Sequence, residues 1–132
     1  MCTTCYSSPE LDLEEIKDII DQTSEWGCEV LNPLGGEPFM RADLEEILRY
    51  AVSKGFYVSL TTNATLISPS RAKYLARIPS DRLHFNISLD GDQASNDAIR
   101  GEGNYNKAIR GFQNIRTADR EQGNSRRKIL SN

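Results

Sequence analysis

Apolar side chains recur every three or four residues in four stretches of this chain, and shorter apolar runs lie between them. The first spacing is typical of helices with one buried face, and runs rich in Val, Tyr, Phe and Ile are typical of strands. The pattern predicts helices over residues 12–26, 43–54, 68–78 and 104–122. It predicts strands over residues 28–32, 56–62 and 82–89, with a further strand beginning near residue 126. Strands that alternate with helices favour an α/β fold with a parallel sheet.

Three of the predicted helices begin with capping residues. Asp12 with Glu15, and Asp43 with Glu46, have the spacing of a capping box, in which each side chain bonds the backbone N–H of the other residue. Ser68 comes directly before a proline, the order expected for an N-cap and the first helical position. The chain has no linker or low-complexity segment between these elements, which indicates one domain rather than two.

Two of the predicted strands carry a polar row as well as an apolar one. In one strand, Leu83, Phe85, Ile87 and Leu89 alternate with His84, Asn86, Ser88 and Asp90, and a similar polar row runs through Tyr57, Ser59, Thr61 and Asn63. A parallel strand covered on both faces would be apolar on both, so the polar rows indicate a wet interior or a ligand cavity. An edge strand exposed to water is the alternative. We expect Ser88 and Asp90 to point into the concave side, and Ile87 and Leu89 to pack on helices.

Composition narrows the classes of function. The 132 residues carry 19 acidic and 16 basic side chains, a net charge of −3, so no basic surplus exists to hold a nucleic-acid backbone. No apolar stretch approaches the roughly 18 residues of a membrane span, and the polar, acidic first residues do not form a signal peptide. Three cysteines are too few for a disulfide scaffold. We therefore expect a cytoplasmic protein that binds neither nucleic acid nor membranes.

Cys2 and Cys5 form a C-x-x-C pair at the start of the chain. Such a pair is typical of half a zinc site, a redox pair or part of an iron–sulfur site. A zinc site needs a second pair of ligands, for which the chain offers only Cys28 and His84. A redox pair normally lies at the start of a helix, whereas the first predicted helix begins several residues later. The pair alone leaves these alternatives open.

Short polar motifs follow the ends of three successive predicted strands. They are Gly35-Gly36-Glu37-Pro38, Thr61-Thr62-Asn63 and Ser88-Leu89-Asp90-Gly91. The carboxyl ends of parallel strands meet at one edge of a sheet, and ligands bind there. We therefore expect the three motifs to line one mouth, although a tight turn or a helix cap would explain each motif singly.

The motifs together resemble the core of radical S-adenosylmethionine (radical SAM) enzymes. That family begins with C-x-x-x-C-x-x-C, whose last two cysteines correspond to Cys2 and Cys5. Its G-G-E-P, S-L-D-G and D-x-I-R-G motifs correspond to residues 35–38, 88–91 and 97–101, and the resemblance extends to about residue 122. The last motif is most familiar in the branch with a C-terminal SPASM or twitch domain.

The resemblance implies a parallel-stranded α/β fold that forms about half of a partial (β/α)6, TIM-like barrel. Residues 1–132 would then be a fragment of a radical SAM core domain, without the first strand and the later barrel strands. Cys2 and Cys5 would be ligands of a [4Fe–4S] cluster, which cleaves SAM to methionine and a 5′-deoxyadenosyl radical that abstracts hydrogen from the substrate. The residues expected to bind SAM are Gly35, Gly36 and Glu37 at its amino group, with Ser88, Asp90 and Asn63 at its ribose or methionine portion.

The same resemblance implies partners. A flavodoxin or ferredoxin would supply the electron, so the protein is expected to be an oxidoreductase. A peptide or protein is the expected substrate, since the SPASM branch includes peptide-modifying enzymes and sulfatase maturases. Haem-biosynthesis proteins belong to the same branch, and the sequence does not identify the substrate or the oligomeric state.

This sequence also departs from the family pattern. The first motif cysteine would lie four residues before Cys2, Thr4 stands where an aromatic residue is common, and Ala64 replaces the glycine of T-N-G. Cys28 cannot replace the missing ligand, because it lies seven residues before Gly35, about 20 Å along a strand at roughly 3.3 Å per residue. We therefore expect the 132 residues alone to be inactive in SAM cleavage. The alternative is a non-catalytic relic or binding module that keeps the fold without a functional cluster.

Overall fold

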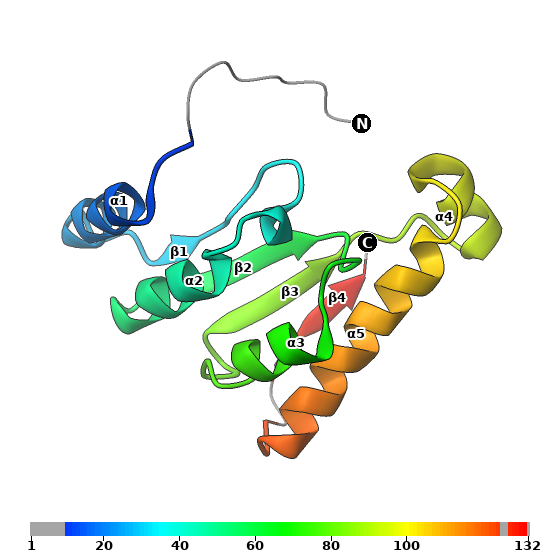
Figure 1. Ribbon diagram of the computed structural model, residues 1–132. Coiled ribbons are helices and arrows are strands. Elements are labelled where there is room, and N and C mark those ends of the chain that lie inside the picture. The colour runs from blue at the N-terminus through cyan, green and yellow to red at the C-terminus, as the bar shows by residue number, and fades with distance from the viewer. Residues whose placement is uncertain (1–9, 125–126, 132) are drawn as a thin grey trace.

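Four parallel strands form one sheet in this computed structural model, which describes residues 10–124 and 127–131 (Figure 1). The strands follow one another across the sheet in chain order: β1 (Val30–Leu31), β2 (Tyr57–Thr62), β3 (Leu83–Ile87) and β4 (Ile129–Ser131). The helices are α1 (Leu13–Glu25), η1 (Pro38–Met40), α2 (Leu44–Ser53), α3 (Pro69–Leu75), α4 (Gln93–Arg100) and α5 (Asn104–Glu121). The predicted α/β architecture with a parallel sheet is confirmed.

The helices cover one face of the sheet and leave the other open. Figure 1 shows α2, α3 and α5 in front of the strands, with α1 beside β1. The apolar row predicted for β3, namely Leu83, Phe85 and Ile87, is buried on the helix side together with Val58 and Leu60 of β2. The alternating polar residues are only half-buried. The predicted parity is therefore confirmed for Ile87, which lies in the core, and Leu89 packs against the same core.

The edge-strand alternative for the polar rows is wrong. β2 and β3 carry these rows, and they are the two central strands of the described sheet. Each of them has a hydrogen-bonded neighbour on both sides, so water at a sheet edge does not account for their polarity. The rows instead belong to one continuous open face.

Several elements differ from the sequence prediction; η1 was not predicted, α3 ends at Leu75 and β4 begins at Ile129. β1 pairs only at Val30 and Leu31, because the turn after α1 extends to Cys28, whose N–H bonds Thr23 O, and Pro33 follows soon after. β3 ends at Ile87 rather than two residues later. The helix α4 was not predicted, because its sequence is mostly polar and has too few apolar positions to show a helical period.

One predicted capping box is confirmed and the other is wrong. Asp12 accepts from the Glu15 N–H at 2.9 Å, and Glu15 accepts from the Asp12 N–H at 2.8 Å. Asp43 makes no capping bond, because Arg41 holds its carboxylate with N···O distances of 2.6 and 3.0 Å. That arginine also lowers the pKa of Asp43. A charged neighbour two residues away thus competes successfully with the helix N-terminus.

A buried ion pair fastens β4 to the rest of the fold. Arg127 donates to both carboxylate oxygens of Asp119, at 2.8 and 2.9 Å, and both side chains are almost fully buried. The remaining guanidinium nitrogens donate to the carbonyls of Leu83, Leu75 and Ile78 at 2.8–3.2 Å. The Arg127 side chain therefore joins α5, β3 and the end of α3, and each of its three guanidinium nitrogens has an acceptor.

Replacing Arg127 by Ala should lower the free energy of unfolding by about 3–5 kcal/mol, because it leaves the Asp119 carboxylate buried and without its cation. Urea denaturation followed by circular dichroism measures this. Lys73→Ala is the matched control, since the Lys73–Glu121 pair is 3.6 Å long and more than half exposed, and should cost no more than about 1 kcal/mol. Equal losses in the two variants would contradict the role given to Arg127.

A second constraint joins α5 to the end of β2. Ala64 is fully buried and has a left-handed backbone with φ of 59°. It stands where the T-N-G motif of the family has glycine. Its carbonyl group lies against Gly111, where an added Cβ would meet the Ala64 oxygen at 2.0 Å. Gly111 is therefore needed for the close approach of the helix.

Gly111→Ala tests this contact, because two effects oppose each other. Alanine should favour the helix by about 1 kcal/mol, yet the clash with the Ala64 carbonyl is backbone and cannot rotate away. We expect a net loss of stability of about 1–3 kcal/mol, measured by urea denaturation. Gln113→Ala, at an exposed position of the same helix, should be neutral or slightly stabilising. A Gly111→Ala variant as stable as the parent chain would refute the contact.

Candidate functional site

The three polar motifs meet at the carboxyl ends of β1, β2 and β3. They surround a small pocket of about 200 Å³, which we call the mouth pocket. Its lining consists of Leu34, Gly35, Gly36, Glu37, Thr61, Thr62, Asn63, Ser88 and Arg100. A larger pocket of about 750 Å³ adjoins it and shares Gly36, Asn63, Ser88 and Arg100. The structure thus brings together five of the six described residues that the sequence proposed for ligand binding.

Gly35 and Gly36 are exposed glycines with open space over their backbone in the described part of the chain. Neither has a positive φ, and a Cβ added to either would meet no atom of residues 10–124 or 127–131 within 4 Å. Backbone strain and internal packing therefore do not explain the two glycines. The open space over their backbone is a cradle that side chains would fill, so it suits a ligand that approaches the main chain closely.

Glu37 ties the loop after β1 to the end of β2. Its carboxylate accepts from the Thr62 hydroxyl at 2.6 Å, from the Asn63 N–H at 2.8 Å and from the Phe39 N–H at 3.3 Å. Most of the acceptor capacity of the carboxylate is used inside the protein. The structure therefore gives Glu37 a positioning role that the motif did not predict, and contact of Glu37 with a ligand stays a prediction.

Asn63 and its neighbours form a tight polar turn at the mouth. The Asn63 side-chain oxygen accepts from the N–H and the hydroxyl of Thr65, at 2.9 and 2.8 Å. The Thr62 hydroxyl, while donating to Glu37, accepts from the Ala64 N–H at 2.9 Å. The turn is thus held by its own side chains, which fixes the Asn63 backbone against the mouth pocket.

Ser88 and Asp90 lie on the same loop but in different surroundings. Ser88 continues the sheet, because its N–H donates to Thr62 O at 2.9 Å, and it lines both pockets. Asp90 does not line either pocket. Its carboxylate accepts from Arg100, and its N–H donates to the buried Asn96 at 3.1 Å. Only the first of the two residues is therefore placed at the mouth.

Arg100 is a mouth residue that the sequence analysis did not propose. It lines both pockets and brings a positive charge to them, and Asp90 is its ion-pair partner. Its motif, residues 97–101, was noted only as a family resemblance. Asp97 of that motif accepts from the N–H groups of Tyr105 and Gly103 at 2.8 and 3.0 Å. The Tyr105 N–H lowers the pKa of Asp97, so a carboxylate holds the α4–α5 turn that presents Arg100.

Below the mouth, polar side chains pair across the open face of the sheet. Asn86 donates to the Ser59 hydroxyl at 2.9 Å, and Tyr57 contacts the His84 ring edge-on with a centroid distance of 4.5 Å. Burial lowers the pKa of His84, and the nearby Lys128 acts in the same direction. The lowered pKa favours the neutral form of His84, and the paired side chains make the open face polar in this region.

The cysteine prediction cannot be followed into the structure, since Cys2 and Cys5 lie outside the described residues. Cys28 is described and exposed, at the far end of β1 from the glycine pair. Within residues 10–124 and 127–131, no group of three or more His, Cys, Asp or Glu side chains could hold a metal ion. In the same part of the chain, no helix has both the length and the apolar character that crossing a membrane requires.

Comparisons with known proteins find relatives over most of the chain. The family model "Radical SAM superfamily" matches residues 2–125. The mycofactocin maturase MftC of Mycolicibacterium smegmatis is 38% identical over 124 residues, which are 89% of this chain and 31% of that protein. The Fe-coproporphyrin III synthase of Methanosarcina barkeri is 38% identical over 121 residues, 86% of this chain and 30% of that protein. The chain therefore spans under a third of the length of these two relatives.

Solved structures show the same fold. The structure described as native anSMEcpe with bound AdoMet matches with a TM-score of 0.74 and 19% sequence identity. The match covers 98% of this chain and 36% of the anSMEcpe chain. The same protein with AdoMet and the Kp18Cys peptide has a TM-score of 0.75 and 18% identity, and covers 97% of this chain and 36% of its own. This likeness confirms the predicted fold class, a partial TIM-like barrel of parallel strands with helices outside.

The positioning role of Glu37 is testable by Glu37→Gln. The amide nitrogen of glutamine cannot accept from Thr62 or Asn63, so the variant should lose about 1–3 kcal/mol of stability. The rate of amide hydrogen exchange at Asn63 should rise, because its N–H loses the carboxylate acceptor. Glu14→Gln, at a side chain that is 81% exposed, is the control and should change neither quantity. Unaltered exchange at Asn63 in Glu37→Gln would show that the carboxylate does not hold the turn.

Proposed function

Because this chain belongs to the radical SAM superfamily, we propose that it is part of the core domain of an enzyme that cleaves SAM to a 5′-deoxyadenosyl radical, and that its mouth pocket binds SAM. The observation that carries the proposal is the glycine pair, Gly35 and Gly36. Their backbone is open where a side chain would otherwise lie, and it faces Asn63 and Ser88 across the same pocket.

Each mouth residue has a role suited to its chemistry. The backbone of Gly35 and Gly36 accepts the amino group of the methionine portion, because peptide carbonyls are acceptors that can approach an ammonium closely. The Ser88 hydroxyl hydrogen-bonds the polar groups of SAM. Arg100 supplies a guanidinium for the carboxylate, for which its planar fork is well suited. Asp90, paired with Arg100, orients that guanidinium, and Glu37 orients the loop.

The cluster is proposed from the motif, with Cys2 and Cys5 as two of its ligands. When bound, the [4Fe–4S] cluster supplies the electron that cleaves SAM. A flavodoxin or ferredoxin is the proposed donor of that electron. The described residues contribute binding, orientation and a polar wall, and none of them replaces a cluster ligand.

We propose a peptide or protein as the substrate class. Two comparisons support this choice, the mycofactocin maturase and the peptide-bound structure of anSMEcpe. The Fe-coproporphyrin III synthase makes a porphyrin the competing class. A C-terminal SPASM or twitch domain is proposed for the whole protein on the D-x-I-R-G resemblance.

Gly36→Val tests the SAM site directly. The isopropyl group of valine would occupy the space proposed for the amino group of SAM. The affinity for SAM should therefore fall about tenfold or more, which is a loss of roughly 1.4 kcal/mol or more in binding free energy. Isothermal titration of SAM into anaerobically reconstituted protein measures the affinity, and the cluster absorbance should be equal in both proteins. Binding rather than cleavage is the readout, so the test stands whether or not this chain completes a catalytic turnover.

Asn32→Val is the matched control for Gly36→Val. Asn32 is exposed in the same loop, but it lines neither the mouth pocket nor the larger pocket beside it. The control should bind SAM as the parent chain does. Normal SAM binding by Gly36→Val would remove the glycine pair from the site. Formation of 5′-deoxyadenosine after reduction would contradict the expectation that the 132 residues alone are inactive in SAM cleavage.

A further inference from the structure

The loop that carries the glycine pair continues into η1, a single turn of 3-10 helix at Pro38–Met40. This turn has few hydrogen bonds of its own. The Met40 N–H donates to Glu37 O, and the Arg41 N–H donates to Pro38 O, both at 3.0 Å. Hydrogen bonds in such a turn have poorer geometry than those of an α-helix. The position of η1 therefore depends on contacts with the rest of the fold.

Arg71, in the first turn of α3, provides such a contact. Its guanidinium donates to the Phe39 carbonyl at 2.6 Å and lies over the Phe39 ring, with the Cζ atom 5.4 Å from the ring centroid. Phe39 itself is buried. A charged donor makes a stronger hydrogen bond than a neutral one, and a guanidinium over an aromatic ring adds a cation–π attraction. Arg71 therefore holds both the backbone and the side chain of Phe39.

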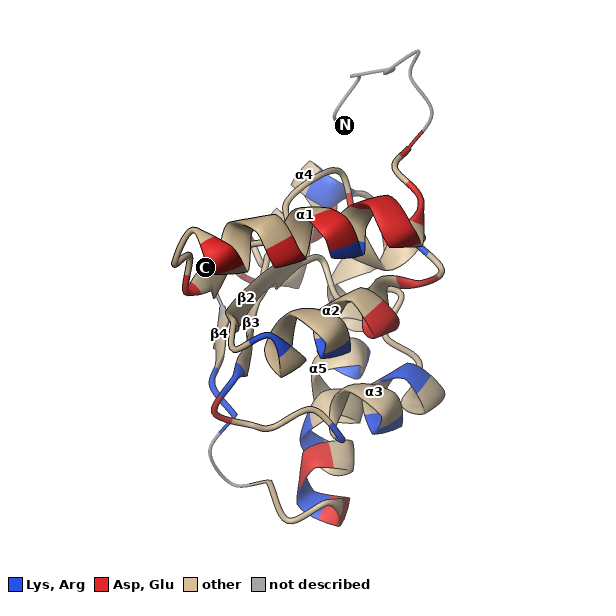
Figure 2. Ribbon diagram, turned by 90° about the vertical axis from the view of Figure 1, so that its left-hand side faces the viewer, with Lys and Arg blue, Asp and Glu red and all other residues tan. Residues whose placement is uncertain are grey.

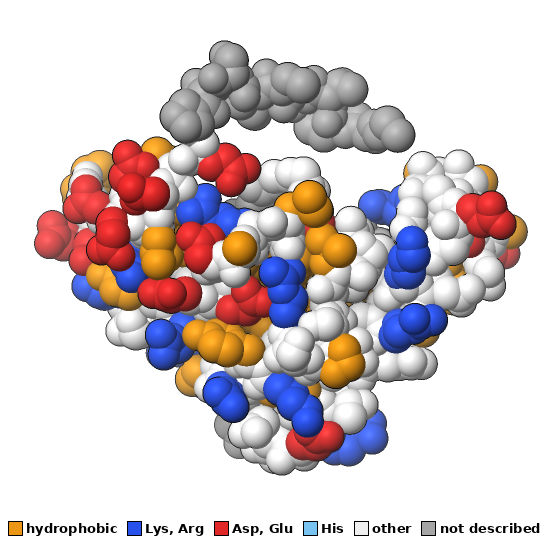
Figure 3. Space-filling view, viewed as in Figure 1, with side chains coloured by type: hydrophobic (Ala, Val, Ile, Leu, Met, Phe, Trp, Pro, Cys, Tyr) orange, Lys and Arg blue, Asp and Glu red, His pale blue; other side chains and the backbone are white. Residues whose placement is uncertain are grey.

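Glu45 of α2 holds Arg71 in place. Its carboxylate lies 3.0 Å from Arg71 Nε, and the Glu45 and Arg71 side chains are only 12% and 26% exposed. A partly buried ion pair of this kind is screened much less by salt than an exposed one. Figure 2 shows acidic positions at the start of α2 next to basic positions at the start of α3, and Figure 3 shows acidic and basic side chains side by side over these two helices. The guanidinium thus joins α2 to η1.

The η1 segment is therefore attached to the β2–α3 unit at two separate points. Glu37 accepts from Thr62 and Asn63 at the mouth, whereas Phe39 accepts from Arg71 at the start of α3. The Phe39 N–H also donates to the Glu37 carboxylate at 3.3 Å, which links the two points. A segment attached at one point can pivot about it, but a segment attached at two points keeps its orientation. The glycine pair directly precedes Glu37, so its backbone takes its direction from both attachments.

We propose that Arg71 is a positioning residue for SAM, an inference that rests on the proposed function of the mouth pocket. Arg71 lines neither the mouth pocket nor the larger pocket beside it, so it acts through Phe39 rather than by touching the ligand. Glycines have more backbone freedom to lose than other residues. A loop that is already held in its binding conformation loses less of that freedom when the ligand binds. Arg71 therefore raises the affinity for SAM from outside the site.

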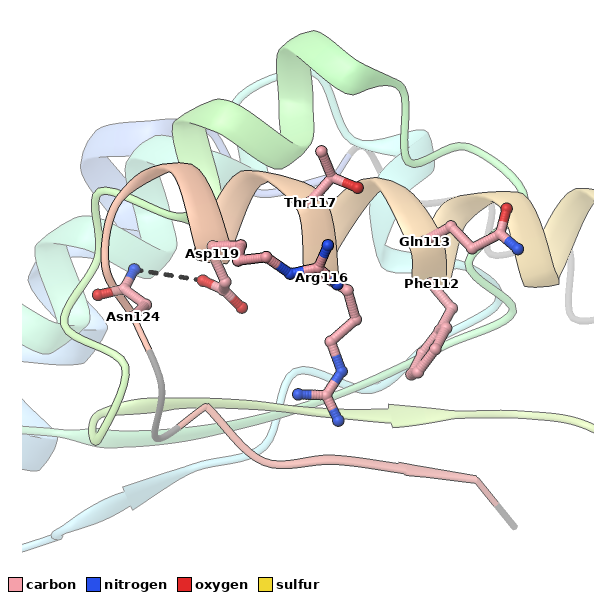
Figure 4. A pocket seen from close by; sticks show the side chains of 7 residues that line it. Phe112, Gln113, Arg116, Thr117, Asp119 and Asn124 are labelled. Carbon is pink, nitrogen blue, oxygen red and sulfur yellow. Dashed lines mark hydrogen bonds between the residues drawn. The ribbon is translucent and has the colours of Figure 1, made fainter.

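Arg71→Gln tests the proposal, and Arg116→Gln is its matched control. Arg116 lies over the Phe112 ring, with its Cζ atom 5.5 Å from the ring centroid, in a groove along α5 (Figure 4). Figure 4 shows both side chains pointing from α5 toward the strands. This groove shares no residue with the mouth pocket. The control variant thus removes a similar arginine–aromatic contact without changing the contacts of η1.

Two quantities should change in Arg71→Gln. The rate of amide hydrogen exchange at Met40 and Asn63 should rise about threefold or more, because η1 loses one of its two attachments. The affinity for SAM, from isothermal titration into anaerobically reconstituted protein, should fall about three- to tenfold. Arg116→Gln should change neither quantity. Circular dichroism establishes that each variant is folded, and a folded protein of merely lower stability would bind SAM as the parent chain does.

Unchanged exchange at Met40 and Asn63 in Arg71→Gln would overturn the proposal, and so would a SAM affinity equal to that of Arg116→Gln. A parent chain that binds no SAM would instead count against the proposed function. The exchange rates would then still decide whether Arg71 holds the loop, because they are measured without SAM.

Arg71→Lys is the second variant, for the case that Arg71→Gln does not fold. Lysine keeps a cation beside Glu45 and the Phe39 ring, but it lacks the planar fork that reaches two acceptors at once. We expect the same two changes in Arg71→Lys, in the same direction and smaller in size. Exchange rates and SAM affinity that both match those of the parent chain would equally overturn the proposal.

Discussion

The arrangement of the mouth depends on one carboxylate. Glu37 joins the glycine loop after β1 to Thr62 and Asn63 at the end of β2, although these segments are 25 residues apart in the chain. Behind this junction, the Ala64 carbonyl rests on Gly111, which sets the distance between the β2 loop and α5. The loop that carries the glycine pair is therefore held by the hydrogen bonds of Glu37 to Thr62 and Asn63, and the glycines themselves need no packing contact.

The sequence predicted those features that local chemistry decides. The Asp12–Glu15 capping box forms because both partners lie on one helical turn. The apolar row of β3 is buried because a strand places alternate residues on opposite faces. The parallel sheet followed from the alternation of strands and helices. The meeting of the three motifs at one mouth then followed from the parallel sheet.

The sequence did not predict the features that depend on competition between distant or charged groups. The Asp43 carboxylate pairs with Arg41 instead of capping its helix. The Asp90 carboxylate pairs with Arg100, and Asp90 does not line the mouth pocket. Arg100 reaches the mouth only because Asp97 holds the turn after α4. Each of these outcomes depends on an ion pair or a backbone turn that spacing alone does not reveal.

The central claim is that SAM binds on the open backbone of the mouth pocket. Titration of SAM into isotope-labelled, anaerobically reconstituted chain, followed by backbone NMR, tests it most directly. The account predicts that the amide signals of Gly35, Gly36, Asn63 and Ser88 shift together and saturate with one affinity, while those of α1 stay in place. Shifts confined to other segments, or no saturable shift at the glycine pair, would contradict it.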